Sequence, residues 1–63
     1  SVKADYYLNT TQEYETRCQI VENGFSLIDL KLTVPTEKEA KAITNHWNLK
    51  SQEIYTLLLT NLL

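Results

Sequence analysis

Apolar and polar residues alternate along most of the first half of the chain. Three segments share this pattern: residues 2–8, 13–21 and 25–34. In the second of them, Cys18 and Ile20 alternate with Arg17 and Gln19. Alternation with a period of two residues is typical of strands that bury one face. The sequence therefore predicts three β-strands in an antiparallel meander, with one apolar inner face and one charged outer face.

The connection between the second and third strands is predicted to be a three-residue loop, Glu22-Asn23-Gly24. A two-residue Asn-Gly turn would place Cys18 opposite Asp29 and set apolar positions beside polar ones along the hairpin. A longer loop with Gly24 in the left-handed conformation removes this conflict. The neighbours expected in this register are Val21 with Phe25, Ile20 with Ser26, Cys18 with Ile28, Thr16 with Leu30, Arg17 with Asp29, and Glu15 with Lys31.

The second half of the chain predicts two helices, at about residues 36–47 and 51–62. Pro35 cannot continue the third strand. Thr36 followed by Glu39 forms a capping box, which is a helix start signal. These signals place the start of the first helix directly after the sheet.

The second predicted helix is apolar over most of its surface. Asn48 is expected to end the first helix and Ser51 to cap the second. Beyond Ser51, only Glu53, Thr56 and Thr60 form a polar stripe. An apolar arc this wide exceeds what one sheet face can cover, so we expect a partner to cover the rest. The residues expected at this partner interface are Trp47, Tyr55, Leu58, Leu59 and Leu62. The free edge of the strand at residues 25–34 is a further place where a partner could dock.

The predicted fold class is α+β, with a three-stranded antiparallel meander followed by two C-terminal helices in one small domain spanning residues 1–63. A chain of this length buries only about 60% of the surface that its unfolded form exposes. Such domains usually add a disulfide, a metal or an oligomeric partner. Cys18 is the only cysteine, and the single histidine has no metal-ligand spacing, so neither a disulfide nor a metal is expected. Oligomerisation, as a homodimer or as a subunit docked on another protein, is the remaining way to stabilise so small a domain.

Charge and hydropathy narrow the class of partner. Six Lys and Arg residues against eight Asp and Glu residues give a net charge of −2, which predicts no general attraction to polyanions. No apolar run is long enough to cross a membrane, and no secretory leader is visible. Together with the lone cysteine, these features favour a cytoplasmic location.

The sequence predicts no enzymatic activity, no cofactor and no small-molecule substrate. His46 has no Ser, Cys or carboxylate at a spacing that predicts a catalytic triad, so we interpret it as a helix-end residue. Cys18 falls on the expected inner face, where a cysteine is normally a small apolar filler. A chain with one glycine contains no glycine-rich phosphate loop.

Residues 29–62 carry a resemblance to a known family. A polar-alternating strand, DLKLTVP, leads into the first predicted helix, and NLKSQEIYTLLLTNLL forms the second. This order resembles the ribbon-helix-helix repressors, which dimerise by pairing their strands and insert them into the DNA major groove. The resemblance implies that Asp29, Lys31 and Thr33 face the bases and that Lys50 and Ser51 hold a phosphate at the start of the second helix.

Two functions therefore compete. The first is a non-enzymatic protein-interaction or regulatory module that acts as a homodimer or docks on a partner protein. The second is a DNA-binding transcriptional regulator of the ribbon-helix-helix type. The nearly balanced charge of the outer strand face favours the first, because DNA affinity depends on neutralising phosphates with Lys and Arg.

Overall fold

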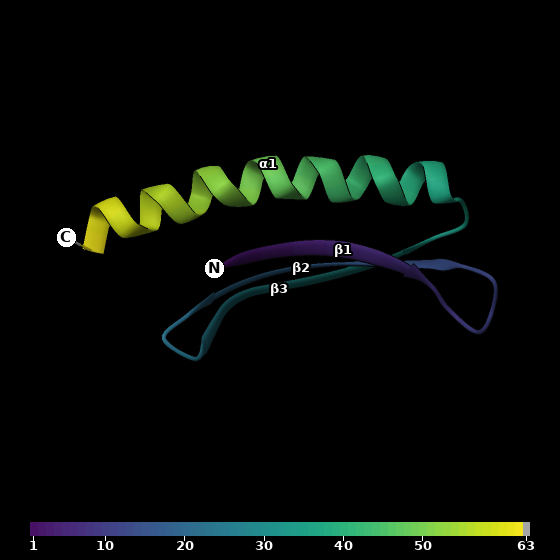
Figure 1. The fold of residues 1–63 in the computed structure, drawn as a ribbon, viewed down its shortest axis with the longest axis horizontal. Coiled ribbons are helices and arrows are strands. Elements are labelled where there is room, and N and C mark those ends of the chain that lie inside the picture. The colour runs from purple at the N-terminus through teal and green to yellow at the C-terminus, as the bar shows by residue number, and fades with distance from the viewer. Residues whose placement is uncertain (63) are drawn as a thin grey trace.

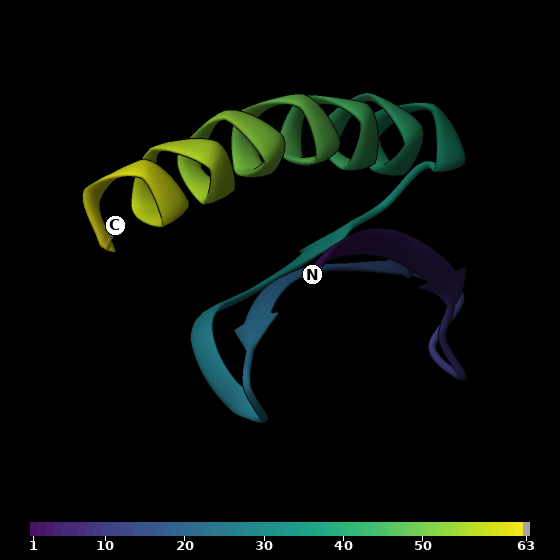
Figure 2. The same ribbon diagram turned by 60° about the vertical axis from the view of Figure 1, so that its left-hand side comes forward.

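The computed structural model describes residues 1–62, and Leu63 lies outside the described residues. The three strands form one antiparallel sheet in the order β1-β2-β3, which confirms the predicted α+β meander. The helix lies along one face of this sheet (Figure 1, Figure 2). The elements are β1 (Val2–Leu8), β2 (Tyr14–Glu22), β3 (Phe25–Val34) and α1 (Glu37–Leu62).

The predicted three-residue loop between β2 and β3 is wrong. Asn23 and Gly24 have φ values of 52° and 81°, and Glu22 pairs with Phe25. Positive φ at both central residues is what a two-residue hairpin turn of type I′ requires. The conflict in register is resolved inside β3, where Leu27 is an extra residue in a β-bulge and has no opposite residue on β2.

The bulge moves the pairing of β3 by two residues from the expected register. Each inner residue of β2 pairs further along β3: Ile20 with Ile28, Cys18 with Leu30 and Thr16 with Leu32. On the outer face, Arg17 lies opposite Lys31 rather than Asp29. Glu15 lies opposite Thr33 rather than Lys31. The Arg17 guanidinium still reaches Asp29 diagonally, with its Nε and one Nη 3.1 and 3.0 Å from the two carboxylate oxygens.

The predicted break between two helices is also wrong, because α1 runs unbroken from Glu37 to Leu62. The segment Asn48–Ser51 contains no Gly or Pro, and an Asn or Ser inside a helix costs at most about 0.7 kcal/mol relative to Ala. The buried and half-buried residues of α1 keep one helical phase through this segment and include Ala40, Thr44, Trp47, Ser51, Tyr55 and Leu58. Thr36 does cap the helix, since its Oγ1 accepts a hydrogen bond from the Glu39 N–H at 3.2 Å.

The core is a close contact between small side chains of the central strand and of the helix. The buried side chains are Thr16, Cys18 and Ile20 of β2 together with Ala40, Thr44 and Ser51 of α1. Ser51 Oγ lies 2.9 Å from Cys18 Sγ, which joins the middle of the helix to the middle of the sheet. Side chains this short allow the helix to lie close to the strand that it covers.

We expect Thr44→Val to stabilise the chain. Thr44 Oγ1 is buried and has no hydrogen-bond partner within residues 1–62, and an unpaired buried hydroxyl costs about 1–3 kcal/mol. The free energy of unfolding in urea should therefore rise by roughly 1 kcal/mol. Thr16→Val is the matched control, because Thr16 Oγ1 donates to the Leu32 carbonyl at 2.8 Å and its loss should be destabilising. Effects of the same sign in both variants would contradict this account of the core.

The continuity of α1 is tested by Asn48→Ala. In an unbroken helix, alanine should raise the free energy of unfolding by roughly 0.5 kcal/mol through helix propensity. At a left-handed helix end, the same substitution would be destabilising, because Asn tolerates that conformation better than Ala. Asn45→Ala, also at an exposed helical position, provides the reference value. A loss of stability in Asn48→Ala alone would restore the two-helix interpretation.

Candidate interaction surface

The helix covers only part of the sheet. It packs on β1 and on β2, and it barely touches β3. The end of the β2–β3 hairpin also curves away from the helix (Figure 1, Figure 2). The inner face of β3 is therefore open.

Leucines occupy this open face. Leu30 and Leu32 point to the same side as the buried Cys18 and Thr16, because directly paired residues of antiparallel strands share a face. Their exposed fractions are nevertheless 48% and 47%. Ile28, the next inner residue, is half-buried. These three residues, Ile28, Leu30 and Leu32, are called the β3 apolar strip below.

Most of the helix residues that were predicted to contact a partner are half-buried within the single chain. Trp47, Tyr55 and Leu58 are half-buried, and Leu59 is 39% exposed. The side chain of Leu62 lies outside the described residues. The Tyr55 hydroxyl donates a hydrogen bond to Glu22 Oε2 at 2.5 Å, and this contact holds the second half of α1 against the end of β2. The helix exposes other large apolar side chains instead, namely Leu49, Ile54 and Leu57.

Sequence reasoning named the free edge of the strand at residues 25–34 as a place where a partner could dock, but it did not expect the inner face of that strand to be exposed, because it assumed two helices above the sheet. An α-helix is about 10 Å wide with its side chains, and neighbouring strands lie about 4.8 Å apart. A single helix therefore covers about two strands of a sheet. The signal was the alternation of Ile28, Leu30 and Leu32, which predicts an inner face wherever the helix happens to lie.

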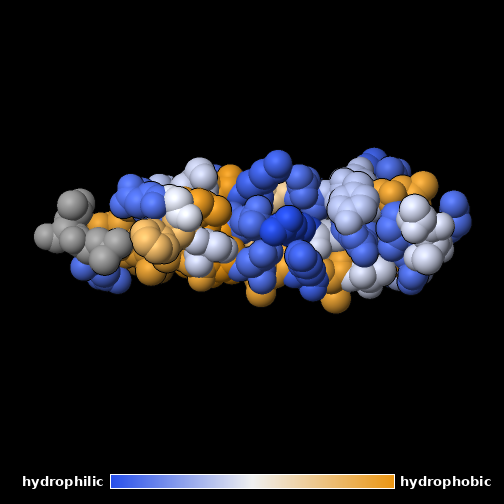
Figure 3. Space-filling model, turned by 90° about the horizontal axis from the view of Figure 1, so that it is seen from below, coloured by the Kyte–Doolittle hydropathy of each residue, from blue (hydrophilic) through white to orange (hydrophobic). Residues whose placement is uncertain are grey.

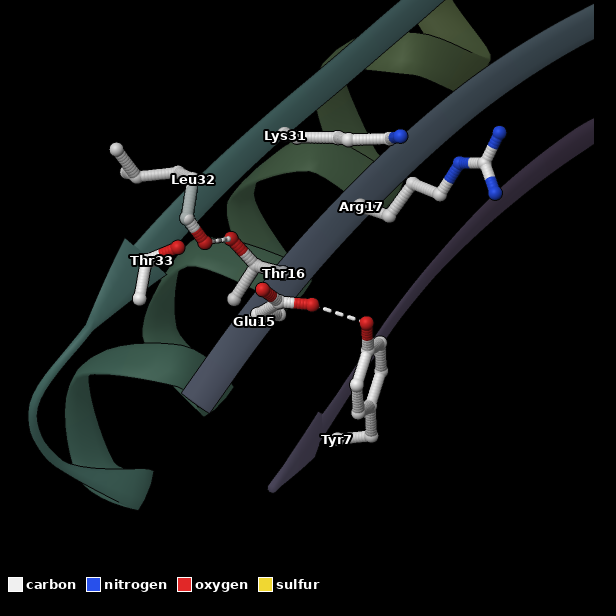
Figure 4. Close-up of a pocket in the computed structure, with 7 residues that line it drawn as sticks. All are labelled: Tyr7, Glu15, Thr16, Arg17, Lys31, Leu32 and Thr33. Carbon is white, nitrogen blue, oxygen red and sulfur yellow. Dashed lines mark hydrogen bonds between the residues drawn. The ribbon is translucent and has the colours of Figure 1, made fainter. Parts of the chain in front are cut away.

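The outer face of the sheet is hydrophilic across its middle (Figure 3). It contains a shallow hollow of about 390 Å³, lined by residues of all three strands (Figure 4). Tyr7 donates a hydrogen bond to Glu15, and this contact raises the pKa of the Tyr7 phenol. The Arg17 guanidinium bonded to Asp29 lowers the pKa of that carboxyl group. Lys31 extends beside Arg17 from the neighbouring strand (Figure 4).

The structure does not gather the residues that the ribbon-helix-helix resemblance implied. Asp29, Lys31 and Thr33 lie together on the outer face of β3, as their alternation predicts. Lys50 belongs to α1, which covers the opposite face, and its Nζ lies 3.7 Å from Glu53. Ser51 is an interior residue of the helix, and its hydroxyl is buried against the sheet.

Within residues 1–62, no cluster of three or more His, Cys, Asp or Glu side chains could hold a metal ion. Cys18 is buried, whereas His46 is exposed on α1. No helix in this described part of the chain is both long and apolar enough to cross a membrane.

One comparison with known proteins places the chain in a family. The model of a family described as a domain of unknown function, DUF4364, matches residues 1–62. The chain belongs to the DUF4364 family. No curated protein and no solved structure gives a match.

We expect the contact between Tyr55 and Glu22 to make this DUF4364 chain sensitive to alkaline pH. The hydrogen bond to Glu22, then desolvation and the carboxylate charge, raise the pKa of Tyr55 above its ordinary value of 10.0. A raised pKa contributes stability that is fully present below pH 10 and is lost as the pH rises through the folded-state value. Thermal unfolding between pH 7 and 11 should therefore show a smaller alkaline loss in Tyr55→Phe than in the wild type. Glu22→Gln should also reduce the loss, and identical alkaline profiles in all three proteins would rule the contact out.

Proposed function

We propose that this chain is a non-enzymatic protein-interaction module that contacts a partner protein through β3 and its apolar strip. The partner that we favour is a second copy of the chain, and the alternative is a different protein on which the chain docks as a subunit. A regulatory role is proposed together with this association. The lone reduced cysteine is consistent with action in the cytoplasm.

The observation that carries this proposal is the exposure of Leu30 and Leu32 on the inner face. Single leucines on an outer surface are ordinary, but these two lie next to each other and continue a core that ends at β2. Covering apolar surface is worth about 25 cal/mol for each Å² removed from water. A contiguous apolar patch beside a core is typical of a protein–protein contact.

The shape of the chain supports the same conclusion. The radius of gyration of the Cα atoms is 13.0 Å. A compact domain of this length has a value of about 10.6 Å. The accessible surface is 4708 Å², whereas a monomeric protein of this mass exposes about 4,200 Å². The chain thus exposes more surface than a self-contained domain of its size.

A second candidate function is DNA binding by a ribbon-helix-helix dimer. The free edge of β3 and the outward position of Lys31 and Thr33 favour it. The pairing of Asp29 with Arg17 and the burial of Ser51 weaken it, because they remove a basic group and a helix start from the proposed DNA surface. Binding to duplex DNA that weakens with salt and is lost in Lys31→Ala would favour this function over the first.

The interaction proposal is tested by the mass of the chain in solution. Light scattering at two concentrations should show a mass above 7.3 kDa that rises with concentration. Leu32→Glu should give a folded monomer, because a carboxylate cannot be covered by an apolar partner surface. Leu57→Glu is the matched control, since Leu57 is 61% exposed on the helix and lies outside the strip. A wild-type chain that stays monomeric at both concentrations would contradict self-association.

A further inference from the structure

We propose that two copies pair edge to edge through β3, antiparallel, with Leu30 on the two-fold axis, to form one continuous six-stranded sheet. This inference rests on the proposed function and specifies its geometry. It assigns the β3 edge as the interface and the ion pairs between Asp29 and Lys31 of opposite copies as the contacts that fix its register.

The backbone of β3 offers the hydrogen-bonding groups that such pairing needs. Val21 N–H donates to the Ser1 carbonyl at 2.9 Å, so the odd-numbered residues of β2 bond toward β1. Hydrogen-bonding direction alternates along a strand, so the even-numbered residues of β2 bond toward β3. In β3, the residues that pair with these even-numbered residues point their backbone N–H and C=O groups toward β2. The N–H and C=O groups of Asp29, Lys31 and Thr33 therefore point to the free edge of the sheet.

β3 is a better interface than β1, which is the other edge of the sheet. The inner residues of β1 between Val2 and Tyr6 are half-buried beneath the helix. On its outer face, Lys3 and Asp5 already form an ion pair at 3.6 Å. Only the β3 edge combines unpaired backbone groups with the exposed apolar strip, and an open edge of this kind is a template for strand pairing.

Symmetry restricts the register of the pairing. A two-fold axis perpendicular to the sheet keeps both inner faces on the same side, and directly opposite residues of antiparallel strands share a face. The axis must therefore pass between one residue of β3 and the same residue of the second copy. An axis at Asp29 or at Lys31 would set that residue against its own copy and place like charges opposite each other. An axis at Ile28 or Leu32 would leave both charges without an opposite charge across the strands.

An axis at Leu30 gives every residue of the strip an apolar neighbour across the new strand pair. Asp29 then lies opposite Lys31 of the second copy, and the reciprocal pair forms by symmetry. On the inner face, Leu30 meets its own copy and Ile28 meets Leu32 of the other copy. The five residues from Ile28 to Leu32 all lie beyond the bulge at Leu27, where the strand is regular.

Of the residues on the β3 edge, Lys31 is the one that acquires an ion-pair partner in this arrangement. In the single chain it lies directly opposite Arg17, which places two cations side by side on the outer face. Within the described residues, no carboxylate oxygen lies within salt-bridge distance of its Nζ, since Asp29 is taken by Arg17. Pairing brings Lys31 against Asp29 of the second copy, so that each carboxylate lies between an Arg17 and a Lys31. Opposite-charge pairs across strands stabilise a sheet, and like-charge pairs destabilise it.

Charge reversal tests the register. In Asp29→Lys, two lysines would meet at each pair, and in Lys31→Glu two carboxylates would meet. Each single variant should therefore raise the dissociation constant of the dimer by about tenfold or more in sedimentation equilibrium. When the two variants are mixed in equal amounts, a mixed dimer sets the introduced lysine against the introduced glutamate and the native Asp29 against the native Lys31. Association should then return to within about threefold of the wild type.

Two controls accompany the mixture. Lys38→Glu makes the same charge change as Lys31→Glu at an exposed helix position and should leave the dissociation constant unchanged. Circular dichroism of each variant establishes that it is folded, which is expected because Asp29 and Lys31 are exposed. A mixture that associates no better than its components would overturn the proposed register, even if the wild-type chain is a dimer.

A cysteine at the axis gives an independent readout. Leu30→Cys is made together with Cys18→Ala, because Cys18 pairs with Leu30 and could otherwise form a disulfide within the chain. Two axial residues in a non-hydrogen-bonded antiparallel pair have Cα atoms about 4.5 Å apart, within disulfide range. Mild oxidation should therefore give a covalent dimer, while Leu57→Cys in the same background should not. A dimer that fails to cross-link at position 30 would place the interface elsewhere, and a wild-type monomer would overturn the proposed function as well.

Discussion

One helix must cover the inner face of a three-stranded sheet, and it is too narrow to do so. A helix is about 10 Å wide, and three strands present a wider apolar face than that. In this chain the helix lies over β1 and β2 and leaves β3 open. The position of the helix therefore decides which residues become core and which become candidate interface. The exposure of Leu30 and Leu32 follows from this mismatch in width.

Small side chains explain why the helix lies where it does. Ala40, Thr44 and Ser51 are buried on the sheet side of the helix, and Ser51 contacts Cys18 of the central strand. Short residues let two backbones approach, whereas larger ones would hold the helix further from the sheet. The contact from Tyr55 to Glu22 then holds the second half of the helix over the end of β2. The apolar residues of β3 are left to pack against something other than α1.

The alternation along the strands predicted much of the fold, because a period of two residues is a local property that holds wherever the strand lies. It placed Asp29 and Lys31 on the outer face and Leu30 on the inner face, as in the structure. The position of the bulge could not be predicted in the same way. An extra residue in the turn and an extra residue at Leu27 restore the same alternation, and they differ in the backbone of Asn23 and Gly24 and in the strand pairing that follows.

The errors in the helical region came from tertiary contacts that override local preference. Asn48 and Ser51 favour helix ends on propensity, but Ser51 is buried against Cys18 and the helix continues through both. This continuity also changed the candidate site. With two helices, the leucine-rich C-terminal segment was the expected contact surface. With one helix, the uncovered residues include those of β3, and their exposure depends on the lateral position of α1, which no local pattern reports.

Hydrogen–deuterium exchange at single-residue resolution tests the central claim most directly, by comparing the two edges of the same sheet. The amides of Asp29, Lys31 and Thr33, which point to the free edge of β3, should be protected at high protein concentration and should exchange rapidly on dilution. By the same alternation, the amides of Ala4 and Tyr6 point outward from β1 and should exchange rapidly at both concentrations. Equal and concentration-independent exchange at the two edges would contradict the account, because β3 would then be an open edge without a partner.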